Sequence, residues 1–200
     1  MNLPSIHNSV VIGQYCAIGD DGFNFIRDAD NKLIHTEHQY SVIIKENVWI
    51  GSHVSIDKGR WRDTVVNGGS KIDNHAHISH NCVIGENVII GAHATILGSV
   101  YIDDNSEIWS NAVIHQGVHI GKNCAVGANT YLRHNLEDNM VAYTSNITGQ
   151  LVIKPKHETK KYGNNKDNDK HQTKDNNKDK NKEGGVPGKC LNENCKDTTW

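Results

Sequence analysis

The chain repeats an aliphatic residue at every sixth position over most of its length. From Val66 to Leu132 the period is unbroken, and the same register appears twice upstream. Six residues fit neither the 3.6-residue turn of a helix nor the two-residue alternation of a long strand. A fixed short period predicts a solenoid, in which each repeat packs on its neighbours. The repeated residues are Ile6, Ile12, Ile18, Ile44, Ile50, Ile56, Val66, Ile72, Ile78, Ile84, Ile90, Ile96, Ile102, Ile108, Ile114, Ile120, Val126 and Leu132.

A smaller residue stands four positions after each aliphatic from Val66 onward, so two positions per hexad are expected to point inward. Short strands separated by corners, three of which close a triangular coil, satisfy this pattern. Gly and Asn recur at the corner positions, where they tolerate left-handed backbone. The fold class is therefore all-β. The smaller residues are Ser70, Ala76, Cys82, Val88, Ala94, Val100, Ser106, Ala112, Val118, Cys124 and Thr130.

Composition limits the partners and the compartment. The 200 residues carry a formal net charge of -2, which gives no electrostatic reason to expect nucleic acid or an anionic membrane as a partner. No apolar run approaches the roughly 20 residues that span a bilayer, and no N-terminal segment resembles a secretion signal. We therefore expect a single cytoplasmic domain whose partners are small molecules and further copies of the chain.

Residues 20–41 interrupt the repeat with a polar insertion that contains both phenylalanines of the chain. An insertion of this length in a solenoid with short corners is typical of a functional or a disordered loop. Exposed aromatic residues on such a loop pack either against the flank of the solenoid or against a ring of a ligand. For Phe23 and Phe25 both interpretations stay open.

The hexads end near Leu132, and residues 142–153 are expected to form a short strand or turn that covers the last coil. Residues 1–154 are thus the predicted β-helix domain. Residues 155–200 are expected to be a disordered tail, because residues 164–183 are almost wholly Lys, Asp, Asn and Glu.

Three of the five cysteines, Cys16, Cys82 and Cys124, fall on the small position of the hexad, where a thiol packs as a modest hydrophobe. Cys190 and Cys195 lie in the tail, and no second Cys or His pair with zinc-finger spacing accompanies them. The sequence therefore predicts no metal site.

Specific motifs surround His80. Several of them resemble segments of the UDP-3-O-acylglucosamine N-acyltransferase family, over roughly residues 12–135. A His followed by Asn or Asp before a Val-Ile-Gly hexad is also similar to the sialic-acid-type and bacillosamine- or viosamine-type amino-sugar N-acetyltransferases. The resemblance implies the left-handed parallel β-helix of hexapeptide-repeat acyltransferases. The matching segments are Gly22–Phe25 with Gln39, Ser55–Gly59, Thr64–Val66, Lys71–Asn74, Ile78–Asn81 and Ile84–Gly85.

In both groups of relatives the matching histidine is the general base, which implies that role for His80. An imidazole with an ordinary pKa near ~6.5 is suited to take a proton from an amine at neutral pH. The resemblance to the acetyltransferases also points to Gly98, one coil further on, as the backbone donor to the oxyanion. The alternatives are an edge histidine without function and a glycine needed only at a corner. For the amine substrate the expected contacts are Asp57, Asn74, Asn81, Phe23 and Phe25.

Coenzyme A in this fold lies along an edge of the prism, parallel to its axis. Residues one coil apart stack on each other, so residues above His80 are expected to line the bound acetyl-CoA. Prisms of this family pack as trimers, which implies a homotrimer with its sites at the subunit interfaces. The expected cofactor contacts are Gly98, Ser99, Gln116, Gly117, Arg133 and His134.

The sequence lacks the N-terminal uridine-binding domain and the C-terminal helical extension of the lipid A enzymes. We therefore expect an acetyl-CoA-dependent N-acetyltransferase for an amino sugar, with a nucleotide-linked 4-amino-4,6-dideoxy hexose as the favoured substrate. The alternatives are an acyl-carrier-protein-dependent enzyme of lipid A type, a purely structural prism and a metal enzyme like the γ-carbonic anhydrases. The last needs three histidines, and the spacing of His80, His115 and His119 misses both of its intervals by one residue.

Overall fold

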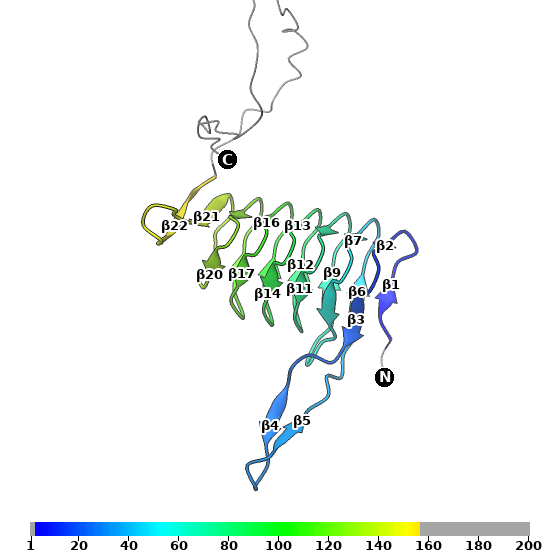
Figure 1. Ribbon diagram of the computed structural model, residues 1–200. Helices are drawn as coiled ribbons and strands as arrows, with labels where there is room; N and C mark the ends of the chain where they lie inside the picture. The colour runs from blue at the N-terminus through cyan, green and yellow to red at the C-terminus, as the bar shows by residue number, and fades with distance from the viewer. Residues whose placement is uncertain (1–2, 157–200) are drawn as a thin grey trace, which may run out of the picture. The chain divides into compact units, whose positions relative to one another are not determined.

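The computed structural model describes residues 3–156, where every regular element is a β-strand. Most strands are two residues long, and the chain turns a corner after each, so that successive strands join three different sheets in rotation (Figure 1). The first sheet contains β1 (Ser5–Ile6), β6 (Val42–Ile44), β9 (Thr64–Val66), β12 (Val83–Ile84), β15 (Tyr101–Ile102) and β18 (His119–Ile120). The second contains β2 (Val11–Ile12), β7 (Trp49–Ile50), β10 (Lys71–Ile72), β13 (Ile89–Ile90), β16 (Glu107–Ile108), β19 (Ala125–Val126), β21 (Met140–Thr144) and β22 (Leu151–Pro155). The third contains β3 (Ala17–Asp20), β8 (Ser55–Asp57), β11 (His77–Ile78), β14 (Thr95–Ile96), β17 (Val113–Ile114) and β20 (Tyr131–Leu132).

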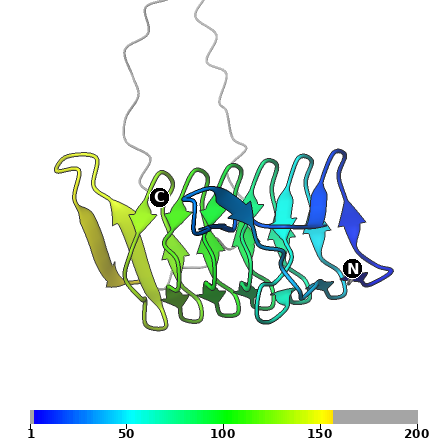
Figure 2. The same cartoon turned by 90° about the horizontal axis from the view of Figure 1, so that it is seen from below.

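Strands of neighbouring coils pair in parallel and in register. Val83 of β12 pairs with Tyr101 of β15, and His77 of β11 pairs with Thr95 of β14. Each hexad therefore supplies one side of a triangular coil, and three hexads complete a turn. Figure 2 shows the coils stacked side by side along the axis. The predicted left-handed parallel β-helix is confirmed.

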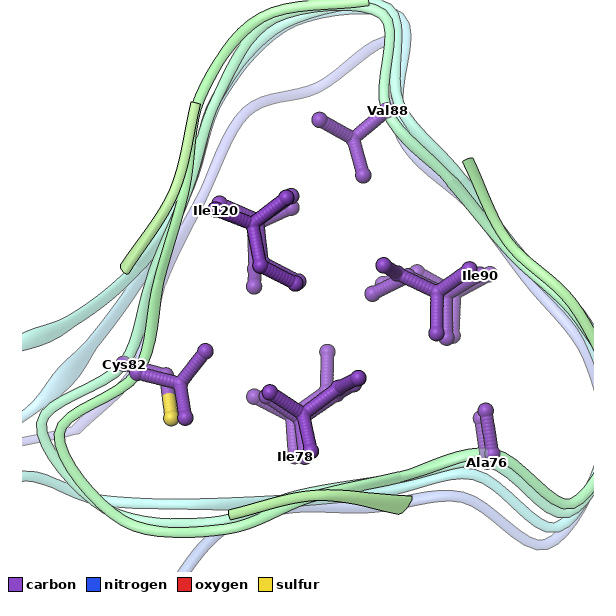
Figure 3. Packing of buried hydrophobic residues seen from close by; sticks show 14 of the residues in the cluster. Ala76, Ile78, Cys82, Val88, Ile90 and Ile120 are labelled. Carbon is purple, nitrogen blue, oxygen red and sulfur yellow. The ribbon is translucent and has the colours of Figure 1, made fainter. Parts of the chain in front are cut away.

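The interior of the prism is filled by the aliphatic residue of each hexad. Figure 3 shows Ile78, Ile90 and Ile120 pointing inward from the three sides, with Val88 and Cys82 near corners. All three isoleucines are 0% exposed. Burial of one such side chain stabilises the fold by roughly 1.5 to 3 kcal/mol, so the repeated column outweighs the weak propensity of two-residue strands. The small position is also buried throughout, as predicted.

The corners hold residues in left-handed backbone. The asparagines predicted for this role have φ between 54° and 60°. One corner departs from the pattern, because it carries rings instead of asparagine in its first four coils: Tyr15, His53, His75 and His93 have φ between 58° and 60°. Their rings stack, with centroids 4.8 Å apart between His53 and His75 and 4.7 Å between His75 and His93. The sequence pattern gave these histidines no role beyond the surface. The asparagines are Asn47, Asn87, Asn105, Asn111, Asn123 and Asn129.

The predicted insertion forms a hairpin of β4 (Phe25–Arg27) and β5 (Leu33–His35) between β3 and β6. Phe23 packs on Phe25 at 5.0 Å between ring centroids, and Phe25 packs on His35 at 5.2 Å. Phe23 is 92% exposed, so the aromatic residues contact each other within the hairpin instead of the flank of the solenoid.

The C-terminal end of the coil is covered as expected. Strand β21 pairs in parallel with β19, and β22 returns antiparallel beside it. Ala142 and Leu136 are buried beneath this cap. The predictions for the tail, Cys190 and Cys195 fall almost wholly outside the described residues. No helix in the described range is long and apolar enough to cross a membrane.

Candidate active site

His80 lies at the corner that follows the third sheet. The register of β11, β14, β17 and β20 places His80, Gly98, Gln116 and His134 in one column parallel to the axis. The backbone ladder continues through this corner, because the N–H of Ser99 donates to the carbonyl of His80 (2.9 Å) and that of Gly117 to Gly98 (3.0 Å). The column is therefore a continuous edge of the prism, and His80 is the first of its four residues along the chain.

Gly98 lies directly against the His80 ring. A Cβ at this position would come within 2.6 Å of Cε1 and 2.8 Å of Nε2 of His80, closer than real Cβ contacts. The backbone of Gly98 is not left-handed, so the close approach of the imidazole is what requires glycine here. Its N–H makes no hydrogen bond with any residue in the described range. Gly98 thus combines contact with His80 and a free backbone donor.

Asn81 fixes the orientation of the His80 ring. Its Oδ1 accepts hydrogen bonds from the N–H groups of Arg60 (2.7 Å) and Trp61 (3.3 Å), which turns Nδ2 toward His80. Nδ2 then donates to Nδ1 of His80 at 3.0 Å, so the neutral ring carries its proton on Nε2. Asn81 is 0% exposed, and the guanidinium of Arg62 donates to its carbonyl. The structure therefore places Asn81 as a support of His80 and not on an open surface.

Two further rings flank His80. Trp61 lies in the longer step between Ile56 and Val66, and its ring centroid is 5.7 Å from that of His80. His38, from the end of the insertion, lies 5.0 Å away in an edge-on arrangement and is only 2% exposed. Neither residue was predicted from the sequence. Trp61 could have been found from the interruption of the hexad, whereas nothing local in the sequence distinguishes His38 from the exposed histidines.

A buried carboxyl group completes the cluster. Asp57, at the end of β8, is 9% exposed, and its Oδ2 lies 3.4 Å from the hydroxyl of Ser79 and 3.8 Å from Nε2 of His77. Burial raises the pKa of Asp57, and the positive charge that His77 and His38 can carry opposes this rise.

The pKa of His80 is shifted in the direction that suits a base. Burial lowers it, and the charges of His38 and Arg60 lower it further. His80 is therefore neutral at pH 7 and able to accept a proton. Perturbed ionisable groups of this kind gather at functional sites more often than elsewhere.

Comparison with known proteins finds the same repeat in other proteins. The family model for the bacterial transferase hexapeptide (six repeats) matches residues 63–98 and again residues 99–134. Residues 63–134 therefore carry the hexapeptide repeat of bacterial transferases. Among curated relatives, a probable mitochondrial UDP-3-O-acylglucosamine N-acyltransferase of Arabidopsis thaliana is 39% identical over 49% of this chain and 32% of its own length. The enzyme of that name from Methylobacterium nodulans is 43% identical over 47% of this chain and 26% of its own length.

Solved structures agree on the fold. UDP-N-acetylglucosamine acyltransferase from Arabidopsis superposes with a TM-score of 0.64 at 21% identity, over 76% of this chain and 50% of that one. The enzyme from Bacteroides fragilis gives 0.56 at 17% identity, over 76% and 72%. At these identities the likeness shows the hexapeptide-repeat fold alone. The predicted resemblance to UDP-3-O-acylglucosamine N-acyltransferases is confirmed, although the chain spans only about a third or less of the length of the curated relatives described above.

The other predicted site residues are spread over several places. Asn74 lies at the preceding corner, one side of the prism away from His80, where its Oδ1 accepts the N–H of Ser52 at 2.8 Å. Phe23 and Phe25 belong to the hairpin. The structure thus brings together His80, Gly98, Asn81 and Asp57, and it does not bring Asn74 to them. Four expected cofactor contacts above Gly98 and Ser99 are exposed along or beside the His80 column: Gln116, Gly117, Arg133 and His134.

The three histidines weighed for a metal do not converge. Nδ1 of His115 is 2.8 Å from the hydroxyl of Tyr131, whereas His119 lies in the first sheet and pairs with Asp103 at 2.9 Å. Between residues 3 and 156 no three His, Cys, Asp or Glu side chains are grouped so that they could hold a metal ion.

The contact between Gly98 and His80 can be tested by Gly98→Ala. The added methyl must push the imidazole aside, and a misplacement of about 1 Å costs roughly 10²-fold in rate. We expect this loss in the turnover of the proposed reaction, with little change in the melting temperature because the ring can move. Unchanged turnover in Gly98→Ala would contradict the contact.

Proposed function

We propose that this protein transfers an acyl group from a thioester to the amine of an amino sugar. The observation that carries the proposal is the pairing of a partly buried, neutral His80 with the free N–H of Gly98 at one edge of the prism. A proton acceptor and an oxyanion donor side by side are what acyl transfer requires. The relatives in sequence are N-acyltransferases of an amino sugar by name, which supports the same reaction class.

In the proposed reaction the amine nitrogen attacks the thioester carbonyl. The imidazole of His80 takes the proton that the nitrogen loses, and the N–H of Gly98 donates to the oxygen that becomes negative. The carbon–sulfur bond then breaks, and the ring returns the proton to the departing thiolate. Because Asn81 donates to Nδ1, this amide must release the ring or the ring must turn before a second proton is taken. A donor of the Gly98 type is worth about 10²- to 10³-fold in rate.

For the acyl donor we propose acetyl-CoA, held along the column from Ser99 and Gln116 to Arg133 and His134. The exposed guanidinium of Arg133 suits the phosphates of this ligand. An acyl-carrier protein is the second candidate, because the relatives in sequence belong to the lipid A type of enzyme.

For the acceptor we propose a nucleotide-linked amino sugar, with a 4-amino-4,6-dideoxy hexose favoured. Arg60 makes no ion pair with any residue in the described range, and its guanidinium lies 5.7 Å from the centre of the Trp61 ring beside His80. A free cation next to a half-exposed indole suits a phosphate and a sugar ring. Asp57 is the group that we propose orients the amine. Phe23 and Phe25 on the hairpin are the proposed contacts for a base or for a neighbouring subunit.

The proposed assembly is a homotrimer with parallel axes. His80 is open to solvent on one side of a single prism, and a neighbouring subunit would exclude water from the reacting groups. The mass in solution from light scattering distinguishes a trimer from a monomer.

The function is tested by thiol release. The purified protein is incubated with acetyl-CoA, with a long-chain acyl-CoA or with an acyl-carrier protein, together with a panel of free and nucleotide-linked amino sugars. We expect release only when a free amine is present, and none with the same sugar already N-acetylated. Release without any amine would indicate a thioesterase, and no release with any pair would contradict an acyltransferase.

A further inference from the structure

His38 is held firmly in place beside His80 although it belongs to the insertion. The base of the insertion is bound to the corner after β8, because the N–H of Lys58 donates to the carbonyl of Asp20 (2.9 Å) and the N–H of Tyr40 to that of Gly59 (2.9 Å). The N–H of His38 itself donates to the carboxylate of Asp21 at 2.7 Å. Its ring reaches His80 at 5.0 Å between centroids, with the two planes at 77°.

The hydrogen bonds of His38 define which ring nitrogen carries the proton. Nδ1 lies 3.0 Å from the carbonyl oxygen of Lys58 and 3.3 Å from the N–H of Gly22. A carbonyl oxygen can only accept, so the shorter contact places the proton on Nδ1 and leaves the lone pair on Nε2. Nε2 is buried and has no partner. Among the residues the structure describes, the other such side-chain atom is Oγ of Ser99, one coil above Asn81.

Buried polar atoms in proteins almost always have a partner, so an orphaned nitrogen next to a proposed base needs a reason. A cation on His80 would lie beside a neutral ring with a free lone pair, whereas two cations at this distance would repel each other. We propose that His38 and His80 work as one histidine pair that accepts a single proton. In the reaction proposed above, on which this role in catalysis rests, His38 is a positioning residue that acts through His80.

The charged groups around the pair fit this role. Asp57 faces the His38 side: a Cβ on Gly22 would lie 2.6 Å from Cε1 of His38 and 2.9 Å from Oδ2 of Asp57. Its carboxylate, when ionised, favours one proton on the pair, since a charge on His38 lowers the pKa of Asp57. The charge of Arg60 opposes a proton on His80, and His77 competes for Asp57. The ammonium of Lys58 is directed to Asp21 at 3.1 Å. These charges together favour one proton on the pair and oppose a second.

The pH dependence follows from these contacts. Burial, the charge of His38 and the charge of Arg60 all lower the pKa of His80. Removing the imidazole at position 38 takes away both the neighbour that favours the first proton and the charge that opposes the second. His80 alone should then titrate in a single step that lies between the two steps of the wild-type pair.

The test uses nuclear magnetic resonance of the imidazole nitrogens in the full-length protein, titrated from pH 4 to pH 9. In the wild type we expect the resonances of His38 and His80 to change together in two separated steps. In His38→Phe, which keeps a buried ring, and in His38→Gln, which keeps a polar group, His80 should titrate in one step whose midpoint lies between the two wild-type steps. His35→Gln, on the exposed strand β5 of the same hairpin, should leave His80 unchanged. This readout needs no substrate.

Independent one-step titrations of His38 and His80 in the wild type would overturn the pair, whether or not either variant folds. Two steps for His80 that persist in a folded His38 variant would also overturn it. In the proposed acyl transfer the acid limb of kcat/KM should follow the higher titration step of His80 in each protein. If no thiol release is found with any substrate, the proposed function fails, whereas the titration still decides the pair.

Discussion

Replacing His80 by alanine is expected to lower the rate of acyl transfer by about 10²- to 10⁴-fold, the usual contribution of a general base. The reason is local, since the ring of His80 lies against Gly98, whose N–H has no partner among the described residues. The side chain lies at an edge of the prism and not in its core, so the coil should remain folded. Thiol release from the acyl donor, measured at saturating amine and over a range of pH, gives the loss of turnover.

A matched control removes a different imidazole. His93 is exposed at another corner with φ of 58°, where the next coils carry asparagine, so His93→Asn suits the backbone. This variant should retain wild-type turnover, and circular dichroism should show the same β-structure in both. Turnover in His80→Ala above about a tenth of the wild-type value would rule out His80 as the base.

Replacing Ile90 by aspartate is expected to unfold the coil. Ile90 is 0% exposed in β13 and pairs in register with Ile72 below it and Ile108 above it. Loss of a buried isoleucine costs about 2 to 5 kcal/mol, and an unpaired buried carboxylate adds several more. The sum is comparable with the whole stability of a typical domain, about 5 to 15 kcal/mol. Urea unfolding followed by circular dichroism measures the loss.

The adjacent residue provides the control for this experiment. Ile89 is in the same two-residue strand but points outward and is 39% exposed. Ile89→Asp should change the free energy of unfolding by no more than about 1 kcal/mol. Equal losses in the two variants would mean that strand propensity, and not the inward column, holds the coil together.

Much of the fold could be predicted because the six-residue repeat determines the strands, the corners and the inward positions of each coil. Ile84, for example, pairs with Val66 in the coil before it and with Ile102 in the coil after it. The six-residue period alone predicts both neighbours, and therefore the burial of Ile84. The same holds for the left-handed corners of the asparagines and for the column that joins His80 to Gly98. The sequence by itself thus determined the solenoid, its inward residues and the edge on which the candidate base lies.

Only the tertiary structure decided what surrounds that base. His38 and Trp61 come from segments without a period, and their rings reach His80 through non-local hydrogen bonds to Lys58 and Asn81. Asn74, close to His80 along the chain, is separated from it because strand β11 carries the chain from one corner to the next. The position of a residue in the repeat follows from its register. The position of a residue in an insertion depends on the distant residues that it contacts, and these contacts cannot be derived from a local sequence pattern.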